Sequence, residues 1–207
     1  AWMQRRHGWK TEADWCIPTY GLVSAIGYSL RAMTEPGDGV MVLFPSYGPF
    51  FRTVADCGRT LVRSDLVLEN GRYVMDFQDI EKKLADPNTK LLIFCNPHNP
   101  TGRVWSREEL EKLGQLCLTY GVGIISDEIH FDLIFRPNVH TVFASVSPEV
   151  ADITVTLTAP SKTFNIAGMT VSNVLISNSE LRRKVETVIS REMGHYINAF
   201  GMAACIA

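Results

Sequence analysis

The stretch "KLLIFCNPHNPTGRVWSREELEKLGQLCLTYGVGIISDEIH", residues 90–130, decides the fold. It opens with a continuous apolar run, "KLLIFC", of the kind that is buried on both faces of a parallel sheet. Ser106 and Glu109 then form a capping-box pattern that predicts a helix start, and Gly121 predicts the helix end. A second apolar run, "VGIIS", follows directly. This strand–helix–strand order predicts two parallel strands joined by a helix.

The same alternation extends along the chain in both directions. Helical patterns cover residues 21–33, 46–58, 75–86 and 179–193, with Asp76 as the N-cap of the third. Strand patterns cover residues 40–44, 59–66, 153–157 and 170–177. The sequence therefore predicts an α/β fold, a mainly parallel open sheet with helices on both faces in three α/β/α layers.

The composition is that of an ordinary soluble globular protein. The chain has 207 residues, of which 46% are hydrophobic and 20% are charged, and its formal net charge is −2. This charge gives no electrostatic case for nucleic-acid binding. The five cysteines lack CxxC spacing, which favours reduced thiols and a cytoplasmic location over a disulfide framework. No apolar run approaches the ~18 residues that a membrane span needs.

The two ends of the sequence lack the signals expected at the ends of a complete chain. The sequence opens with "AWMQRRHGWK", without an initiating methionine, and stops at "NAFGMAACIA", within a helical pattern. Neither end carries a cap or turn signal. We therefore interpret the chain as a piece of a longer protein.

Four residues with reactive or stacking side chains follow predicted strands, where ligands gather in open parallel sheets. They are Tyr47, Asn99, Asp127 and Lys162. Each also suits a structural role when it is taken alone. Tyr47 could lie in the core, Asn99 in a strand-to-helix turn, Asp127 at a polar strand end and Lys162 on the surface.

A metal site is the first alternative for the segment after residue 126. Asp127, Glu128, His130 and Asp132 all carry possible ligand atoms. The alternation of an extended chain would separate Asp127 from the other three, and no second His or Cys cluster lies nearby in the sequence. We therefore predict no metal here.

Taken together, the four residues match the groups that hold pyridoxal 5′-phosphate. Lys162 lies in "TLTAPSKTFNIAGMT", a run without another charged side chain, and such isolation favours the neutral amine that attacks a carbonyl. A carboxylate such as Asp127 would keep the pyridine nitrogen protonated, an aromatic ring such as that of Tyr47 would stack on the cofactor, and an amide such as that of Asn99 would bond its phenolic oxygen. The helix that begins near Gly21 would offer free N–H groups to the phosphate.

With these motifs in hand, the sequence resembles the fold-type I, aminotransferase-like enzymes that use pyridoxal 5′-phosphate. The matching motifs run through the chain in order, as "GLVSAI", "PSYGPFF", "NPHNPTG", "ISDEIH" and "SKTFNIAG". The resemblance implies that residues 1–207 form the large cofactor-binding domain. It further implies a set of cofactor-binding residues, with Lys162 as the covalently linked catalytic lysine: Lys162, Asp127, Tyr47, Asn99, His130, Ser161, Gly21, Leu22 and Val23.

Departures from the aminotransferase pattern narrow the resemblance. His130 stands where many aminotransferases carry a tyrosine, Thr170 where they carry a phosphate-pairing arginine, and Ala159 where a phosphate-binding serine is common. With these departures, and with the motifs "RRHGW", "EPGDGV" and "SDEIH", the sequence is similar to one branch of the family, the cystathionine β-lyases or C–S lyases of the MalY and PatB type.

That branch implies a β-lyase that splits cystathionine- or cysteine-type amino acids into a thiol, pyruvate and ammonia. Two alternatives stay open: an aminotransferase of amino acids, and a regulatory protein that binds a transcription factor. The resemblance also implies a homodimer, and a small domain after residue 207 that carries the arginine for the substrate carboxylate. The substrate therefore cannot be predicted from this chain.

Overall fold

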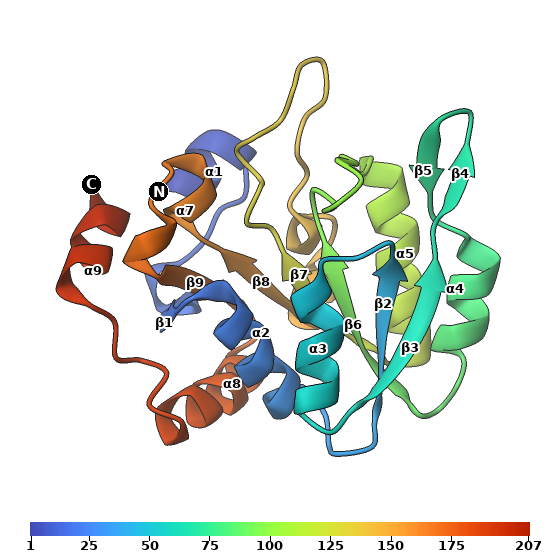
Figure 1. Cartoon of the computed structure of the whole chain (residues 1–207), viewed down its shortest axis with the longest axis horizontal. Helices are drawn as coiled ribbons and strands as arrows, with labels where there is room; N and C mark the ends of the chain where they lie inside the picture. Colours follow the sequence, from blue (N-terminus) through green and yellow to red (C-terminus); the bar gives the residue numbers. More distant parts are fainter.

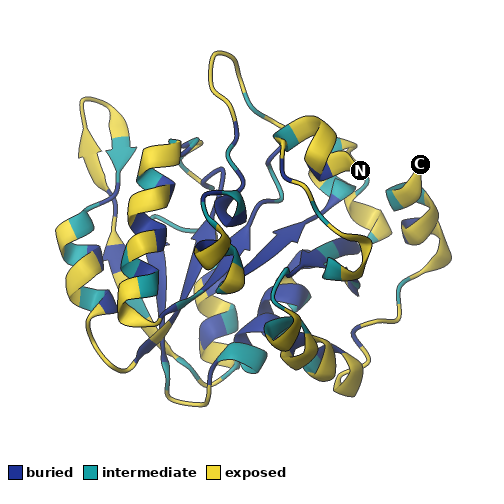
Figure 2. Cartoon of the chain, turned by 180° about the vertical axis from the view of Figure 1, so that it is seen from behind, coloured by how far each residue is buried: buried dark blue, intermediate teal, exposed yellow.

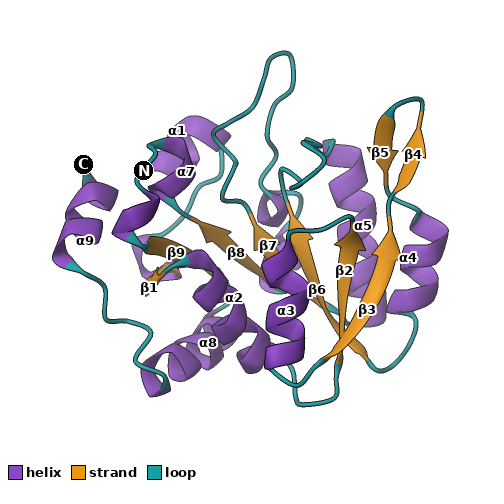
Figure 3. Cartoon of the chain, viewed as in Figure 1, coloured by secondary structure: helices purple, strands orange, loops and turns teal.

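The computed structural model describes residues 1–207, and a seven-stranded sheet forms its centre (Figures 1 and 3). In spatial order the strands are β1 (Cys16–Tyr20), β9 (Val171–Leu175), β8 (Thr154–Thr158), β7 (Gly123–Asp127), β6 (Thr89–Cys95), β2 (Gly39–Phe44) and β3 (Thr60–Asp65). A separate two-stranded hairpin consists of β4 (Val67–Glu69) and β5 (Arg72–Val74).

The helices surround this sheet. They are α1 (Trp2–His7), α2 (Leu22–Met33), α3 (Gly48–Asp56), α4 (Phe77–Leu84), α5 (Arg107–Tyr120), α6 (Pro148–Asp152), α7 (Pro160–Thr163), α8 (Ser179–Arg191) and α9 (Ala199–Ile206). Three short 3-10 turns complete the structure: η1 (Ala13–Trp15), η2 (Phe143–Ser145) and η3 (Ala167–Met169). None of the helices is long and apolar enough to cross a membrane.

The predicted parallel sheet is confirmed for five adjacent strands, which are β8, β7, β6, β2 and β3. The remaining two strands are antiparallel, since β9 pairs with β8 and β1 pairs with β9. Strand β1 was not predicted. Its five residues, "CIPTY", include a proline and no clear alternation, and its partner lies more than 150 positions away in the sequence.

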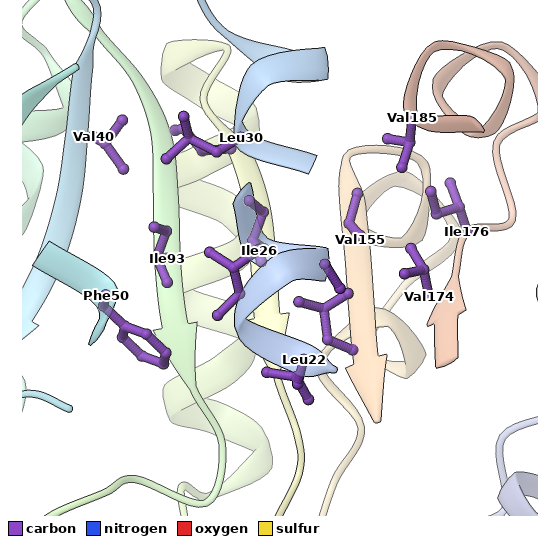
Figure 4. Packing of buried hydrophobic residues seen from close by; sticks show 14 of the residues in the cluster. Leu22, Ile26, Leu30, Val40, Phe50, Ile93, Val155, Val174, Ile176 and Val185 are labelled. Atoms are coloured by element: carbon purple, nitrogen blue, oxygen red, sulfur yellow. The ribbon is translucent and has the colours of Figure 1, made fainter. Parts of the chain in front are cut away.

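Two apolar layers lie on opposite faces of the sheet and confirm the three-layer arrangement. On β6, Leu91 and Ile93 face the layer formed with α2, α3 and α8, whereas Leu92 and Phe94 face the layer formed with α4, α5 and α6. Figure 4 shows the first layer, and Figure 2 shows the buried strands beneath exposed helix faces. Because both faces of β6 are covered, its sequence is continuously apolar from Leu91 to Cys95 rather than alternating.

The helix boundaries follow their capping residues. The Ser106 hydroxyl accepts the N–H of Glu109 (3.2 Å), and the Glu109 carboxylate accepts the N–H of Ser106 (2.7 Å), so the predicted capping box is present. Gly121 ends α5 in the left-handed conformation, and the Asp76 side chain caps α4 as predicted.

Candidate active site

The carboxyl ends of the parallel strands meet at one edge of the sheet and border a cavity of about 320 Å³. All nine residues predicted to bind a cofactor line it: Gly21, Leu22, Val23, Tyr47, Asn99, Asp127, His130, Ser161 and Lys162. They come from segments as far apart as residues 21 and 162. The parallel topology brings them together because each segment follows a strand end or begins a neighbouring helix.

Asp127 is the last residue of β7 and lines this cavity. Its exposed fraction is 3%, and Oδ1 accepts the N–H of Ile129 (3.1 Å). Oδ2 has no hydrogen-bond partner within the chain. Burial raises the pKa of Asp127 to about 7, although the Ile129 N–H and the charge of Lys162 act in the opposite direction. The carboxylate is therefore a desolvated acceptor, which a cationic ligand group would stabilise in its ionised form.

Lys162 lies on α7, a single helical turn that follows β8. Its side chain is exposed, lines the cavity and forms no ion pair with an acid of this chain. Its charge lowers the pKa of Asp127, so the two groups interact electrostatically. The apolar neighbours Phe164 and Met169 do not enclose Lys162, because Phe164 is 54% exposed and Met169 is 37% exposed. The amine therefore opens into the cavity without an apolar cover.

Three further predicted residues line the cavity and differ in how far they are buried. Tyr47 precedes α3 and is 40% exposed, so its ring is available for stacking on a planar ligand. Asn99 is half-buried in the loop after β6. His130 is half-buried, and burial together with the charge of Lys162 lowers its pKa, which leaves a neutral imidazole at pH 7.

The N-terminus of α2 also lines the cavity. Gly21 adopts φ 74° and ψ 145°, a conformation that L-residues rarely adopt, and helix α2 starts at the next residue. The N–H groups of Leu22 and Val23 make no hydrogen bond within the chain. These free donors suit a phosphate group, and so does the hydroxyl of Ser161, which lines the same cavity.

Six further residues line the cavity that were not predicted to bind a cofactor. Cys95, Ile129, Ala167 and Val171 also border the cavity, as do Ala159 and Thr170. Cys95 is the last residue of β6, so its position at a strand end was the available signal. Burial raises the pKa of its thiol well above the ordinary range, which makes it a packing group rather than a nucleophile.

The other acids after β7 have separate partners. Glu128 accepts bonds from Ser126 (2.8 Å) and the N–H of Phe143 (3.0 Å) and pairs with His140 (2.7 Å). Asp132 contacts helix α1 instead, through His7. No group of three or more His, Cys, Asp or Glu side chains in residues 1–207 is placed to hold a metal ion.

Comparison with known proteins decides the family. The model of the family "Aminotransferase class I and II" matches residues 1–205. The chain belongs to this family. Cystathionine beta-lyase PatB of Bacillus subtilis is 48% identical over 203 residues, which cover 98% of this chain and 52% of that protein. The predicted resemblance is therefore confirmed, and the chain spans about half the length of the curated relatives it matches.

Solved members of the family have the same fold. The crystal structure of cystalysin from Treponema denticola, which contains a pyridoxal 5′-phosphate cofactor, superposes with a TM-score of 0.96 at 44% identity. It covers 99% of this chain, which in turn covers 52% of cystalysin. The pyridoxal-phosphate-bound C–S lyase of Staphylococcus hominis gives a TM-score of 0.86 at 38% identity, over 90% of this chain and 48% of that one. The predicted fold is confirmed, and so is the predicted cofactor for these relatives.

Proposed function

We propose that this chain is the cofactor-binding domain of a pyridoxal 5′-phosphate-dependent carbon–sulfur β-lyase. Its substrates would be amino acids with sulfur on Cβ, such as cystathionine or cysteine, and its products a thiol, pyruvate and ammonia. The observation that carries the proposal is the cavity at the strand ends, which joins Lys162, Asp127 and the open N-terminus of α2. The names of the lyase relatives support the same reaction.

The cavity fits this cofactor in size and in chemistry. Its volume of about 320 Å³ is within the range of small-ligand pockets. The free Oδ2 of Asp127 suits a protonated ring nitrogen, and the free N–H groups of Leu22 and Val23 suit a phosphate. Asn99 and His130 offer neutral polar groups that line the same cavity.

Each residue then has a defined task. When bound, pyridoxal 5′-phosphate supplies an electron sink for negative charge at the substrate Cα. Lys162 would hold the cofactor covalently and, once displaced by the substrate amine, remove the Cα proton as a general base. Asp127 would keep the ring nitrogen protonated, and Tyr47 would stack on the ring. Loss of the thiolate from Cβ would complete the elimination, and water would then hydrolyse the remaining three-carbon amine to pyruvate and ammonia.

An aminotransferase is the second candidate, and family membership favours it. It would use the same residues but return the amino group to a keto acid. Two neutral residues favour the lyase: Thr170 and Ala159 line the cavity at positions where the aminotransferase pattern has a phosphate-pairing arginine and a serine. We also propose that the intact protein is a cytoplasmic homodimer, which light scattering and cell fractionation can test.

Product analysis of the complete natural protein, loaded with pyridoxal 5′-phosphate, separates the two reactions. With L-cystathionine and no keto acid, we expect continuous release of pyruvate and thiol. Lys162→Ala should reduce the rate at least ~10³-fold, because it removes both the covalent anchor and the base. Lys184→Ala, at an exposed ion pair with Glu180 on α8, is the control and should retain full activity. Turnover that requires a keto acid would contradict the lyase assignment.

A further inference from the structure

The carboxylate of Asp132, in the segment after β7, contacts both helix α1 and helix α7. Its side chain is 2% exposed. Oδ1 accepts a hydrogen bond from His7 Nε2 (2.9 Å), Oδ2 accepts one from the Thr163 hydroxyl (2.9 Å), and the indole N–H of Trp2 lies 3.1–3.2 Å from both oxygens. Burial acts to raise the pKa of Asp132, but the bonds from His7, Thr163 and Trp2 outweigh it and hold the pKa below its ordinary value. The carboxylate is therefore ionised.

These contacts connect helix α1 to the two residues that follow Lys162. Trp2 and His7 belong to α1, whereas Thr163 is the last residue of α7. The Trp2 ring also packs edge-on against Phe164, with 5.6 Å between the ring centroids. Figures 1 and 3 show α1 and α7 side by side at the same edge of the molecule. Helix α1 therefore contacts residue 163 through Asp132 and residue 164 directly.

Helix α7 also contacts β9 and η3, but it is a short and exposed element. It contains four residues, and none of them is buried. A single turn is unstable by itself, because its nucleation cost is not recovered by further turns. The Lys162 side chain forms no ion pair that would orient it. The placement of its amine therefore depends on how the backbone of α7 is held.

We propose that Asp132 is a positioning residue, whose bridge from α1 to Thr163 holds α7 so that the Lys162 amine is presented to the cavity. This inference rests on the proposed function, since it assigns to Lys162 the covalent link and the proton transfer. It adds a role for α1, a segment that contributes nothing to the cavity lining. Hydrogen bonds to an ionised carboxylate are directional and strong, which suits this role.

The sharpest variant is Thr163→Val, which removes one hydroxyl and retains the shape of the side chain. In the complete natural protein we expect kcat for elimination to fall about 10- to 100-fold, with KM within ~2-fold, because a small misplacement of a reacting group has effects of this size. The covalent attachment of pyridoxal 5′-phosphate, followed by absorbance, should slow by a similar factor. Thr163→Ser, which retains the hydroxyl, should restore both rates to within ~3-fold of wild type.

Asp132→Asn and a double variant extend the test. Asp132→Asn should lower the same two rates at least as far as Thr163→Val. The double variant should match Asp132→Asn alone, because both changes break one bridge. Asp65→Asn, at an exposed ion pair with Arg63, is the control and should change neither rate. If Asp132→Asn fails to fold, Thr163→Val and Thr163→Ser decide the question by themselves.

The outcomes distinguish this inference from the proposed function. Wild-type attachment rates and kcat in Thr163→Val would overturn the positioning role while leaving Lys162 in its role. A wild-type protein that forms no covalent link at Lys162 would overturn the proposed function, and the positioning role with it. A loss in Thr163→Ser as large as that in Thr163→Val would also overturn the role of the hydroxyl bridge.

Discussion

At the scale of single residues, Asp127 shows how a strand end becomes a reactive position. The sequence places it at the end of an apolar run, and the fold buries it beside the cavity with one oxygen free. Burial raises its pKa to about 7 because the charged form loses its hydration. Such a carboxylate destabilises the fold when it is ionised, and it gains most from a cationic ligand.

Because the buried, ionised Asp127 carboxylate destabilises the fold, we predict that Asp127→Asn stabilises the cofactor-free protein and impairs its activity. We expect activity with pyridoxal 5′-phosphate to fall at least ~100-fold, as for other losses of a catalytic electrostatic group. Without cofactor, the variant should exceed the wild type in free energy of unfolding at pH 8 by an amount on the order of 3 kcal/mol. Urea unfolding at several pH values measures the difference.

The sign of the pH dependence follows from the raised pKa. The folded protein binds the Asp127 proton more tightly than the unfolded chain, whose aspartate pKa is 3.8. The contribution of Asp127 to stability is therefore complete below pH 4 and is lost as the pH rises towards 7. The gap between Asp127→Asn and the wild type should open across this window. A gap that is constant from pH 4 to pH 8 would contradict the account.

At the scale of elements, the N-terminal end of α2 provides the donors for the proposed phosphate site. Helix α2 presents free N–H groups because Gly21 takes a backbone conformation that other residues adopt only with strain. A Cβ at this position would meet no atom within 4 Å, so a substitution changes the backbone preference alone. The phosphate site therefore depends on one glycine.

Gly21→Ala tests this dependence. We expect its affinity for pyridoxal 5′-phosphate to fall about 10-fold, because the cost of φ 74°, ~1–3 kcal/mol, would shift the α2 terminus. Gly58→Ala is the matched control: it also has positive φ (71°) and open space, but it lies after α3 and does not line the cavity. It should lose stability while it retains affinity. Equal affinities in both variants and the wild type would argue against the phosphate site.

Elements whose signals lie nearby in the sequence could be predicted, whereas elements that depend on distant contacts could not. The caps at Ser106 and Asp76 and the buried strand β6 could be predicted because their signals lie within a few residues. Strand β1, the antiparallel direction of β9 and the Asp132 bridge could not, since each depends on a pairing or contact with a segment outside its own local sequence pattern. Asp132 in particular looks like an ordinary polar residue until α1 is placed beside it.

At the scale of the whole molecule, the parallel sheet explains why the site could be predicted at all. The order of the strands brings residues 21 to 171 to a single edge, so a set of strand-end side chains becomes one cavity. The exposure of Lys162 was not predicted, because its surroundings are set by packing between α7 and distant segments. No arginine lines the cavity, so the group that would bind a substrate carboxylate is not among its residues.

The central claim is that Lys162 holds pyridoxal 5′-phosphate covalently. Its most direct test is borohydride reduction of the complete natural protein incubated with the cofactor, followed by peptide mass spectrometry. The account predicts a single stable adduct on the peptide that contains Lys162, present in Lys184→Ala and absent in Lys162→Ala. An adduct on another lysine, or none in the wild type, would contradict it.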